Sequence, residues 1–356
     1  MLVTPHVDDA ATGGRVLLSQ LHLKCLKAML ADCLVVHALS QARDSGRRPR
    51  VDALRGYIDG ITPEVETAIL ARVRDQAINR IFLDGSNLGR LARAIKRRLP
   101  NVEVLTFFHN VEARFFFGAL KQYRSARALG VLAANYASER MAVRYSDRLI
   151  TLNKRDSAGI ADLYGRAATD VLPMAIEDKL RNEADAPQSP LKEPYALFVG
   201  GAFYANQFGI QWFVENVVPE VSIKTCIVGK GLEALRGELE RDGKVEVVGA
   251  VDELGRWYRN AKVVIAPIFD GSGMKTKVAE ALMYGKRIIG TREAFSGYED
   301  CVDEVGWLCN TKEEFVAALR RVEGESYPPF DPSLRAIYER CYSYDAALSR
   351  FSAMLS

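Results

Sequence analysis

The chain has 356 residues, of which 48% are apolar and 26% are charged, and its formal net charge at pH 7 is +3. This length and composition are those of a folded globular protein with about two domains, and they exclude a disordered or fibrous chain. Residues 1–178 carry 26 Lys and Arg against 19 Asp and Glu. Such a basic half suits an anionic partner, and it equally suits a solvated face with no partner.

The apolar runs and the cysteines indicate a cytoplasmic protein. The longest apolar runs, such as residues 263–269, have the length of a strand and fall short of the ~18–20 residues of a membrane helix. Asp8 and Asp9 stand where a secretory signal would place basic and then apolar residues. The six cysteines form no CxxC pair and have no histidine at zinc spacing. We therefore expect reduced cysteines, no metal and no cofactor.

The N-terminal half alternates strands with helices. Apolar runs predict strands at 2–4, 33–37, 81–83, 102–108 and 148–152. Amphipathic stretches predict helices at 15–30, 89–99 and 133–145, and the pair Gly13-Gly14 stands just before the first helix. Strands that alternate with helices favour a parallel sheet covered on both faces.

A polar stretch from Asp178 to Pro194 interrupts the alternation and predicts an inter-domain linker. After it, strands are predicted at 196–200, 224–229, 245–249, 262–267 and 287–290, with helices at 208–216, 232–241, 254–260 and 276–284. The predicted fold is α/β, with two doubly wound Rossmann-like domains facing a cleft. Their bounds are 1–178 and 195–331, with a linker at 179–194 and a C-terminal helical segment at 332–356. Ligands in such sheets bind at the carboxyl ends of the strands.

The most informative segment is 265–285. A strand ends at Pro267, a loop with Gly271 and Gly273 follows, and a helix begins near Met274. Helix N-termini expose unpaired N–H groups, and glycines let a ligand approach the backbone. The segment therefore has the outline of an anion site.

Charged residues flank this loop. Lys275 and Lys277 add positive charge, and Glu280 lies one turn into the helix, where a carboxylate accepts hydrogen bonds from sugar hydroxyls. A nucleotide P-loop is excluded, because it needs glycine six residues before the lysine and another directly before it. Counted back from Lys275, those positions are Phe269 and Met274. An ordinary surface turn with two solvated lysines stays open as an alternative.

Two further glycine loops end strands of the second domain. Gly200 and Gly201 suit close approach of a diphosphate, although no GxGxxG pattern is present. Gly229-Lys230-Gly231 ends the next strand, and a tight turn is the alternative interpretation there. The chain lacks DxD, HExxH, GxSxG, zinc-finger and RNP-type motifs, so metal-assisted chemistry, serine hydrolysis and nucleic-acid binding lose support.

His109 is the histidine best placed to reach a cleft. It follows the apolar strand at 102–108 and has Asn110 and Glu112 as polar neighbours. Of the four histidines, it alone ends a strongly strand-like run that is followed by polar neighbours. A hydrogen-bonded structural histidine is the ordinary alternative.

The motifs of the second half form an ordered series. They are Phe198-Val-Gly-Gly, Tyr204, Asn206, Trp212-Phe213, Ile227-Val-Gly, Val247-Val-Gly, Asp252, Tyr258, Ala266-Pro267 and Lys277-Val-Ala-Glu280-Ala-Leu. In the N-terminal half Gly13-Gly14, His109-Asn110-x-Glu112, Ser146-Asp147-Arg148, Thr151 and Pro173 also fit one pattern. Together they resemble the retaining GT-B glycosyltransferases of family four (glycosyl transferases group 1), and most closely the bacterial polysaccharide-biosynthesis branch. The resemblance covers nearly the whole chain and is most specific over residues 198–285.

The resemblance implies a retaining, hexosyltransferase-type glycosyltransferase that needs no metal and takes a nucleotide-diphosphate sugar, bound mainly by the second domain. It places Glu280 on the ribose, the backbone of Gly273, Met274 and Lys275 on the diphosphate, residues 249–251 near the base and His109 near the transferring sugar. The candidate catalytic residues are therefore His109, Lys275 and Glu280. The donor-binding candidates are Gly13, Gly14, Gly200, Gly201, Lys230, Gly249, Ala250, Val251, Ser272, Gly273, Met274, Lys275, Thr276, Lys277 and Glu280.

Two features depart from the family pattern. Ser272 stands where members often carry a glutamate that contacts the donor sugar, and Gly201 and Gln207 replace a basic pair. Lys275 or Lys277 would have to supply the lost charge. Two alternatives therefore stay open, a catalytically silent GT-B homologue that acts as a partner protein and a GT-B sugar-nucleotide epimerase.

The acceptor, a saccharide or a lipid-linked saccharide of bacterial surface polysaccharide synthesis, is expected on the basic first domain. Helix 89–99 places Leu91, Ile95 and Leu99 on one stripe and Arg90, Arg93 and Arg97 on another. An aromatic and basic cluster follows, comprising Arg114, Phe115, Phe116, Phe117, Lys121, Tyr123, Arg124 and Arg127. We expect these groups to dock on anionic headgroups at the inner face of the plasma membrane. For the apolar stripe alone, the alternative is the core side of a helix that covers the sheet.

Overall fold

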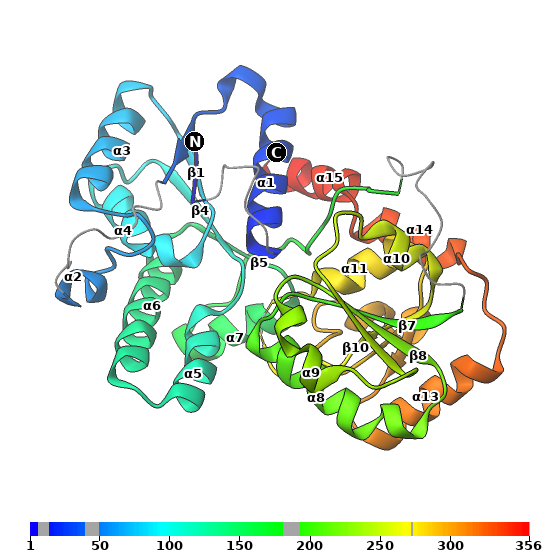
Figure 1. Cartoon of the computed structure of the whole chain (residues 1–356). Helices are drawn as coiled ribbons and strands as arrows, with labels where there is room; N and C mark the ends of the chain where they lie inside the picture. The colour runs from blue at the N-terminus through cyan, green and yellow to red at the C-terminus, as the bar shows by residue number, and fades with distance from the viewer. Residues whose placement is uncertain (6–13, 40–49, 181–192, 272, 356) are drawn as a thin grey trace. The chain divides into compact units, whose positions relative to one another are not determined.

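The computed structural model describes residues 1–5, 14–39, 50–180, 193–271 and 273–355 (Figure 1). The chain divides into two compact units. Unit 1 consists of Met1–Met174 together with Ala347–Ser356, and unit 2 consists of Ala175–Ala346. Each unit contains one six-stranded sheet in which all strand pairs are parallel, so the fold is the two-domain α/β Rossmann-like one that the alternation of strands and helices predicts.

The sheet of unit 1 has the strand order β2-β1-β3-β4-β5-β6. Its strands are β1 (Leu2–Thr4), β2 (Val36–Ala38), β3 (Arg80–Leu83), β4 (Glu103–Phe108), β5 (Arg148–Thr151) and β6 (Asp170–Val171). The helices are α1 (Gly14–Leu30), α2 (Arg50–Leu54), α3 (Pro63–Asp75), α4 (Gly89–Arg98), α5 (Glu112–Tyr123), α6 (Ala126–Tyr145) and α7 (Lys154–Tyr164), with α15 (Tyr344–Leu355) joining from Ala347 onward. Short 3-10 turns lie at Ala31–Cys33 and Ser86–Leu88.

Alternate residues of these strands face opposite layers of helices, which makes the strands apolar throughout. Ile81 and Leu83 of β3 belong to the core that packs under α3 and α4. Phe82, between them, points to the other face, where its ring lies 5.7 Å from His22 of α1 and 5.9 Å from Phe351 of α15. Figure 1 shows α1 and α15 on one side of the sheet and α3 and α4 on the other.

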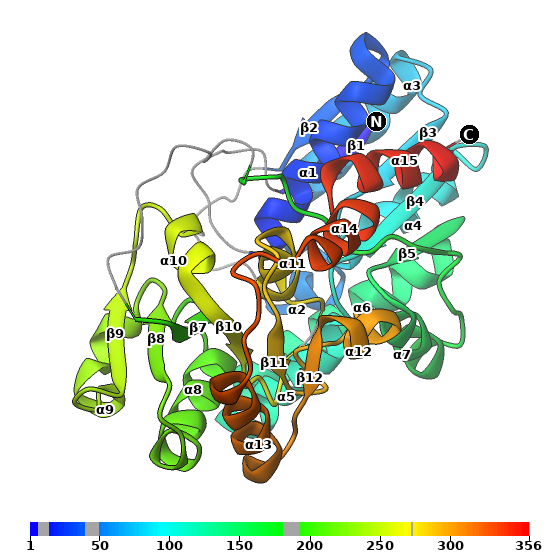
Figure 2. The same cartoon turned by 90° about the vertical axis from the view of Figure 1, so that its right-hand side faces the viewer.

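The sheet of unit 2 has the strand order β12-β11-β10-β7-β8-β9, which Figure 2 shows in sequence across the sheet. Its strands are β7 (Tyr195–Val199), β8 (Lys224–Val228), β9 (Val245–Gly249), β10 (Ala261–Ala266), β11 (Ile288–Gly290) and β12 (Gly306–Leu308). The helices are α8 (Tyr204–Asn216), α9 (Arg236–Leu239), α10 (Gly255–Asn260), α11 (Thr276–Met283), α12 (Val302–Val305), α13 (Lys312–Gly324) and α14 (Pro332–Cys341). Further 3-10 turns lie at Val218–Glu220, Leu232–Leu235 and Glu299–Cys301.

Aromatic contacts fix the two helical layers of unit 2. On one face Phe213 of α8 meets Phe315 of α13 with their ring centroids 5.8 Å apart. On the other face Tyr195 of β7 lies 6.0 Å from Trp257 of α10 and donates a hydrogen bond to its carbonyl. The sheet is therefore covered on both sides, and its carboxyl edge carries the loops between strand and helix.

Local sequence accounts for several helices that periodicity alone did not predict. Thr62 caps α3 by accepting a hydrogen bond from the Val65 N–H, and Pro63 supplies a preset φ in the first turn. Asn153 caps α7 in the same way. At the start of α13, Thr311 and Glu314 form a reciprocal capping box.

Some predicted bounds differ from the structure. The second strand is Val36–Ala38 and not 33–37, because residues 31–33 form a 3-10 turn after α1. Helix α8 starts at Tyr204 and not at 208. The first unit ends at Met174, earlier than the predicted 178, because the Ile176 N–H donates to the Tyr342 carbonyl within unit 2.

The C-terminal helix α15 is bonded to the sheet of unit 1 from Ala347 onward. Phe351 is fully buried there, beside the rings of His22 and Phe82. The Arg80 guanidinium donates to the Leu355 carbonyl at 2.6 Å. The last residues thus complete the face of unit 1 that α1 begins.

Helix α4 has its apolar stripe in the core. Leu91 and Ile95 are fully buried and Leu99 packs against the same cluster, so the ordinary interpretation of this stripe is confirmed. Across the described ranges, the structure has no helix whose length and apolar content would let it cross a bilayer.

Candidate active site

The carboxyl edge of the unit 2 sheet is built from interlocking glycine loops. The N–H of Gly229 donates to the Gly249 carbonyl at 2.7 Å, and the N–H of Gly200 donates to the Val228 carbonyl at 3.0 Å. Gly229 has φ of +153°, and a Cβ there would lie 1.8 Å from the Gly200 carbonyl oxygen. Only glycine permits this approach, so the loops after β7 and β8 touch backbone to backbone, and the Gly229–Gly249 hydrogen bond joins them to the end of β9.

The outer rim of these loops holds three more donor-binding candidates. Lys230 is exposed, and its carbonyl accepts from the Ala202 N–H at 3.0 Å. Ala250 is exposed and Val251 is half-buried just after β9. Gly249 has φ of +81°, with the Glu233 side chain where a Cβ would point. The candidates at 200–201, 230 and 249–251 are therefore brought to one edge.

Lys277 occupies a buried place behind the Gly200 loop. Its ammonium donates to Asn206 Oδ1 at 3.0 Å and lies 4.4 Å from the centroid of the Phe198 ring. Asn206 in turn donates to the Gly201 carbonyl at 2.9 Å. Burial, followed by repulsion from Lys275, lowers the pKa of Lys277 to about 7. Near neutral pH this amine is therefore only partly protonated, and an anion that binds beside it favours the protonated form.

Lys275 makes local contacts that the sequence did not reveal. Its ammonium donates to Glu293 Oε1 at 2.8 Å and to the Gly273 carbonyl at 3.0 Å. Both members of this ion pair are mostly buried. The alternative of two solvated lysines is therefore wrong, and the charge of Lys275 is balanced by an acid eighteen residues later in the chain.

The turn into α11 contains the remaining candidates of unit 2. Met274 is buried against Gly297, and Thr276 opens the helix after Lys275, which makes no side-chain cap. Helix N–H groups without a side-chain cap are available to an anion. Ser272 lies outside the described residues.

Glu280 is the buried acid of this edge. Its Oε2 accepts a hydrogen bond of 2.9 Å from the Tyr258 hydroxyl. Burial raises the pKa of Tyr258 well above its usual value, so the phenol stays a donor. Tyr258 also stacks on Tyr284 with ring centroids 5.1 Å apart. The carboxylate is thus held in one orientation on the first turns of α11.

In unit 1, a buried carboxylate organises the carboxyl edge of the sheet. Asp84 directly follows β3 and is fully buried. Its Oδ1 lies 3.0 Å from His22 Nδ1 and 2.9 Å from His109 Nε2, and its Oδ2 accepts from the Thr4 hydroxyl at 2.7 Å. Burial alone would raise the pKa of Asp84, but attraction and hydrogen bonds from the two histidines hold it well below the usual value.

These contacts orient His109. Burial lowers its pKa although Asp84 opposes the shift, so the ring is neutral at pH 7. A neutral ring that donates from Nε2 to Asp84 keeps a lone pair on Nδ1. That buried Nδ1 has no hydrogen-bond partner among the described residues. His109 therefore presents an oriented acceptor that no described group uses.

A second buried group surrounds the start of α1. Gly14 begins this helix, and the next residue, Arg15, reaches Asn87 Oδ1 at 3.2 Å and Glu112 Oε1 at 3.8 Å. Burial raises the pKa of Glu112 to about 7 despite Arg15. Glu139 accepts the backbone N–H groups of Glu112 and Ala113 at 2.9 Å each and so fixes the start of α5.

The structure thus separates the candidates into two sets. Gly14 and His109 belong to unit 1, Gly13 lies outside the described residues, and the remaining described candidates belong to unit 2. Sequence reasoning missed Asp84 and His22. A polar residue directly after the apolar run 81–83 is a signal that points to Asp84, whereas His22 lies inside an ordinary amphipathic helix and gives no signal.

Comparisons with known proteins agree with this architecture. Residues 193–323 match the family model described as Glycosyl transferases group 1. No curated protein sequence matches the chain. The sucrose-phosphate synthase structure from Thermosynechococcus elongatus is 17% identical, with a TM-score of 0.71 over 99% of this chain and 97% of that one. Anabaena HepE in complex with UDP gives 11% identity and a TM-score of 0.68, with 99% of each chain covered.

A third solved structure, described as trehalose-6-phosphate from E. coli bound with UDP-2-fluoro glucose, is 14% identical, with a TM-score of 0.65 over 99% of this chain and 98% of that one. Identities this low establish the fold alone. The chain therefore has the two-domain Rossmann-like fold of the GT-B glycosyltransferases, and its residues 193–323 match the group 1 glycosyltransferase family.

Proposed function

We propose that this protein is a glycosyltransferase that moves a sugar from a nucleotide-diphosphate donor to a saccharide or lipid-linked saccharide, with retention and without a metal, in bacterial surface polysaccharide synthesis. The observation that carries the proposal is the carboxyl edge of the unit 2 sheet. There, the glycine loops, the start of α11, Lys277 and Glu280 lie within the segment that matches the family model.

Each part of this edge suits one part of the donor. The uncapped start of α11 and the backbone at 273–275 are suited to the diphosphate, because N–H groups and the helix dipole favour negative charge. Glu280 is suited to the ribose hydroxyls, which donate to a carboxylate. Residues 249–251 are suited to contact with the base, and Gly200 and Gly201 to the phosphates.

The chemistry follows from charge that develops on the leaving group. The bond between the anomeric carbon and the β-phosphate oxygen breaks, and both electrons remain on that oxygen. The acceptor oxygen bonds to the anomeric carbon on the same face, and its proton passes to the departing phosphate. Preorganised N–H groups and the Lys277 ammonium stabilise the diphosphate more as its charge grows.

His109 is proposed to contact the transferring sugar. Its ring is neutral and held by Asp84, and its Nδ1, which has no partner among the described residues, would accept a hydrogen bond from a sugar hydroxyl. Such a hydrogen bond orients the sugar without a charge on the imidazole. Asp84 and His22 would act as positioning residues.

A peripheral contact with an anionic membrane is proposed for the α5–α6 hairpin. Phe117 is half exposed, and the Lys121 ammonium lies 4.7 Å from its ring centroid. Leu129 is 55% exposed at the start of α6, beside the exposed Arg127. Exposed apolar side chains among basic ones suit the interface of an anionic bilayer.

A panel of nucleotide sugars tests the proposal. One donor should raise the thermal unfolding temperature, because a ligand that binds only the native state stabilises it. With that donor and a suitable acceptor, the product should keep the anomeric configuration of the donor, and EDTA should not reduce turnover. Glu280→Gln should weaken donor binding, whereas the exposed control Glu313→Gln should not. No stabilisation by any nucleotide sugar would contradict the proposal.

The panel also separates the alternatives. Conversion of the donor to its epimer without an acceptor would indicate an epimerase. Binding without hydrolysis or transfer would indicate a silent partner protein. Salt-sensitive flotation with vesicles that contain an anionic phospholipid tests the membrane contact, and its absence would refute that part alone.

A further inference from the structure

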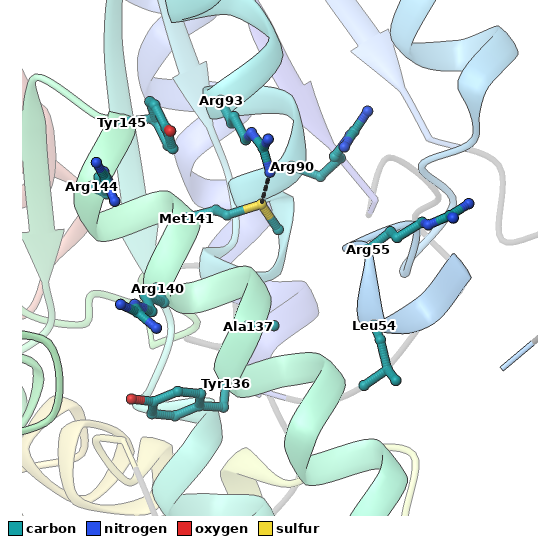
Figure 3. Close-up of a pocket in the computed structure, with 10 residues that line it drawn as sticks. All are labelled: Leu54, Arg55, Arg90, Arg93, Tyr136, Ala137, Arg140, Met141, Arg144 and Tyr145. Carbon is teal, nitrogen blue, oxygen red and sulfur yellow. Dashed lines mark hydrogen bonds between the residues drawn. The ribbon is translucent and has the colours of Figure 1, made fainter. Parts of the chain in front are cut away.

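Unit 1 carries a pocket that none of the proposed donor or transfer residues lines. It has a volume of about 470 Å³ and lies between helices α2, α4 and α6 (Figure 3). Five arginines line it, namely Arg55, Arg90, Arg93, Arg140 and Arg144. We call it the arginine pocket.

Close helix packing brings these arginines together. A Cβ at Gly89 would lie 1.9 Å from the Ser138 carbonyl oxygen, so α4 and α6 touch backbone to backbone there. The Ser138 hydroxyl also donates to the Asn87 carbonyl at 2.7 Å. Arg140 and Arg144 are one turn apart on α6, so their side chains lie on the same side of that helix, and both line the pocket.

Three of these guanidinium groups have no acidic partner among the described residues. Arg90 is neutralised by Glu66 at 2.8 Å and donates to the Tyr57 hydroxyl, and Arg55 lies 3.5 Å from Asp52. In the part of the chain that the structure describes, Arg93, Arg140 and Arg144 have no carboxylate within 4 Å, the ion-pair distance. The contact of Arg93 is with the Met141 sulfur at 3.9 Å, which carries no charge.

Among the described residues that line the pocket there is no Asp or Glu. Cations that line one pocket repel one another, and an anion bound between them relieves that repulsion. Guanidinium groups are planar forks that pair with phosphate oxygens through two parallel hydrogen bonds. Three unpaired arginines exceed what one singly charged carboxylate can neutralise.

The volume and the apolar walls of the pocket restrict the class of ligand further. The volume lies within the range of about 300–1,000 Å³ typical of small-molecule sites. Tyr136, Tyr145, Leu54 and Met141 give it apolar walls, which suit a ring or chain attached to the charged group. We propose that the arginine pocket binds a ligand that carries a diphosphate or two neighbouring phosphates, either a soluble molecule or an anionic phospholipid headgroup.

Calorimetric titration with inorganic pyrophosphate tests the proposal on the full chain. The pocket variant Arg93→Gln/Arg140→Gln/Arg144→Gln should bind pyrophosphate at least about tenfold more weakly than the wild type, because it loses several charge-assisted hydrogen bonds. The control variant Arg72→Gln/Arg74→Gln/Arg98→Gln removes three exposed arginines of unit 1 that lie outside the pocket and outside the proposed membrane contact. It should retain wild-type affinity. Thermal unfolding shows that both variants are folded.

Lys277→Met separates this site from the proposed donor site of unit 2, and it should retain pyrophosphate binding at the arginine pocket. No pyrophosphate binding by the wild type would overturn the proposal. The proposal would also be overturned if Lys277→Met lost pyrophosphate binding while the pocket variant kept it. It would be overturned as well if the pocket variant and the control variant lost the same affinity for pyrophosphate.

Vesicles identify the source of the phosphates. The wild type, the pocket variant and the control variant are floated with vesicles of phosphatidylcholine that contain phosphatidylglycerol, and with vesicles of phosphatidylcholine alone. Selective loss of the pocket variant from the anionic vesicles assigns the phosphates to lipid headgroups. Equal flotation of all three proteins, together with weaker pyrophosphate binding by the pocket variant, assigns them to a soluble ligand.

Discussion

We predict that nucleotide binding beside Lys277 takes up a proton. Its amine is buried between Phe198 and Asn206, and that burial lowers its pKa to about 7 from 10.5. At pH 8 about nine in ten molecules therefore carry the neutral amine. A diphosphate placed beside the amine favours the ammonium, so the complex should hold a proton that the free protein lacks.

The size of the effect follows from this pKa. Binding should take up about 0.9 proton at pH 8, about 0.5 at pH 7 and about 0.1 at pH 6. Above pH 7 the affinity should fall by up to about tenfold per pH unit. The diphosphate itself contributes little at pH 8, because its last ionisation lies near pH 6.

Calorimetry in two buffers measures this proton. A nucleoside diphosphate, UDP first, is titrated at pH 8 in Tris and in HEPES, whose ionisation enthalpies differ. The difference between the apparent binding enthalpies should correspond to about 0.9 proton taken up per ligand. Lys277→Met keeps an apolar stem of similar length against Phe198 and should lose the difference.

Lys262→Met is the matched control, since Lys262 bonds the Glu323 carbonyl outside the candidate site. It should behave as the wild type. Clear binding with equal enthalpies in both buffers would refute the placement of Lys277 beside the diphosphate.

Three stability predictions concern unit 1. Asp84→Asn replaces an acceptor of two imidazoles with an amide and should cost about 3 kcal/mol of unfolding free energy; an unchanged thermal midpoint would contradict the described network. Gly89→Ala should destabilise the protein or displace α6, since its Cβ would meet the backbone of α6. The control Gly130→Ala, whose Cβ would have nothing within 4 Å, should stabilise α6 by about 0.5–1 kcal/mol. Equal shifts in unfolding free energy for the two variants would refute the close crossing of α4 and α6. Burial raises the pKa of Glu112 to about 7 from 4.5, so its contribution is fully present below pH 4.5 and about 3 kcal/mol is lost as the pH rises through 7; Glu112→Gln should lose less stability than the wild type between pH 5 and pH 8, and parallel pH profiles would contradict this.

The fold could be predicted because its signals are local. Parallel strands buried on both faces appear as continuous apolar runs, and the helices between them show their own periodicity. The glycine loops also indicated the carboxyl edge, because Gly200 and Gly229 directly follow β7 and β8 and Gly249 ends β9. The predicted bounds of α8 and β2 were wrong, because loop and cap geometry decide them.

The partners inside the candidate site could not be predicted, because they come from distant parts of the chain. The His22 ring and Asp84 are 62 positions apart, and Asp84 and His109 are 25 apart. Lys275 looked like a free cation until the fold placed Glu293 beside it. A sequence pattern identifies the residue types at strand ends. The order of the strands in the sheet then decides which of these residues form hydrogen bonds or ion pairs with one another.

A crystal structure with the best-stabilising nucleotide sugar tests the central claim most directly. Electron density for its diphosphate should lie against the start of α11 at residues 273–277 and the loops at 200–201 and 229–231, with the ribose at Glu280. A nucleotide bound elsewhere on the chain, with these loops unchanged and bare, would contradict the donor site and with it the proposed transfer.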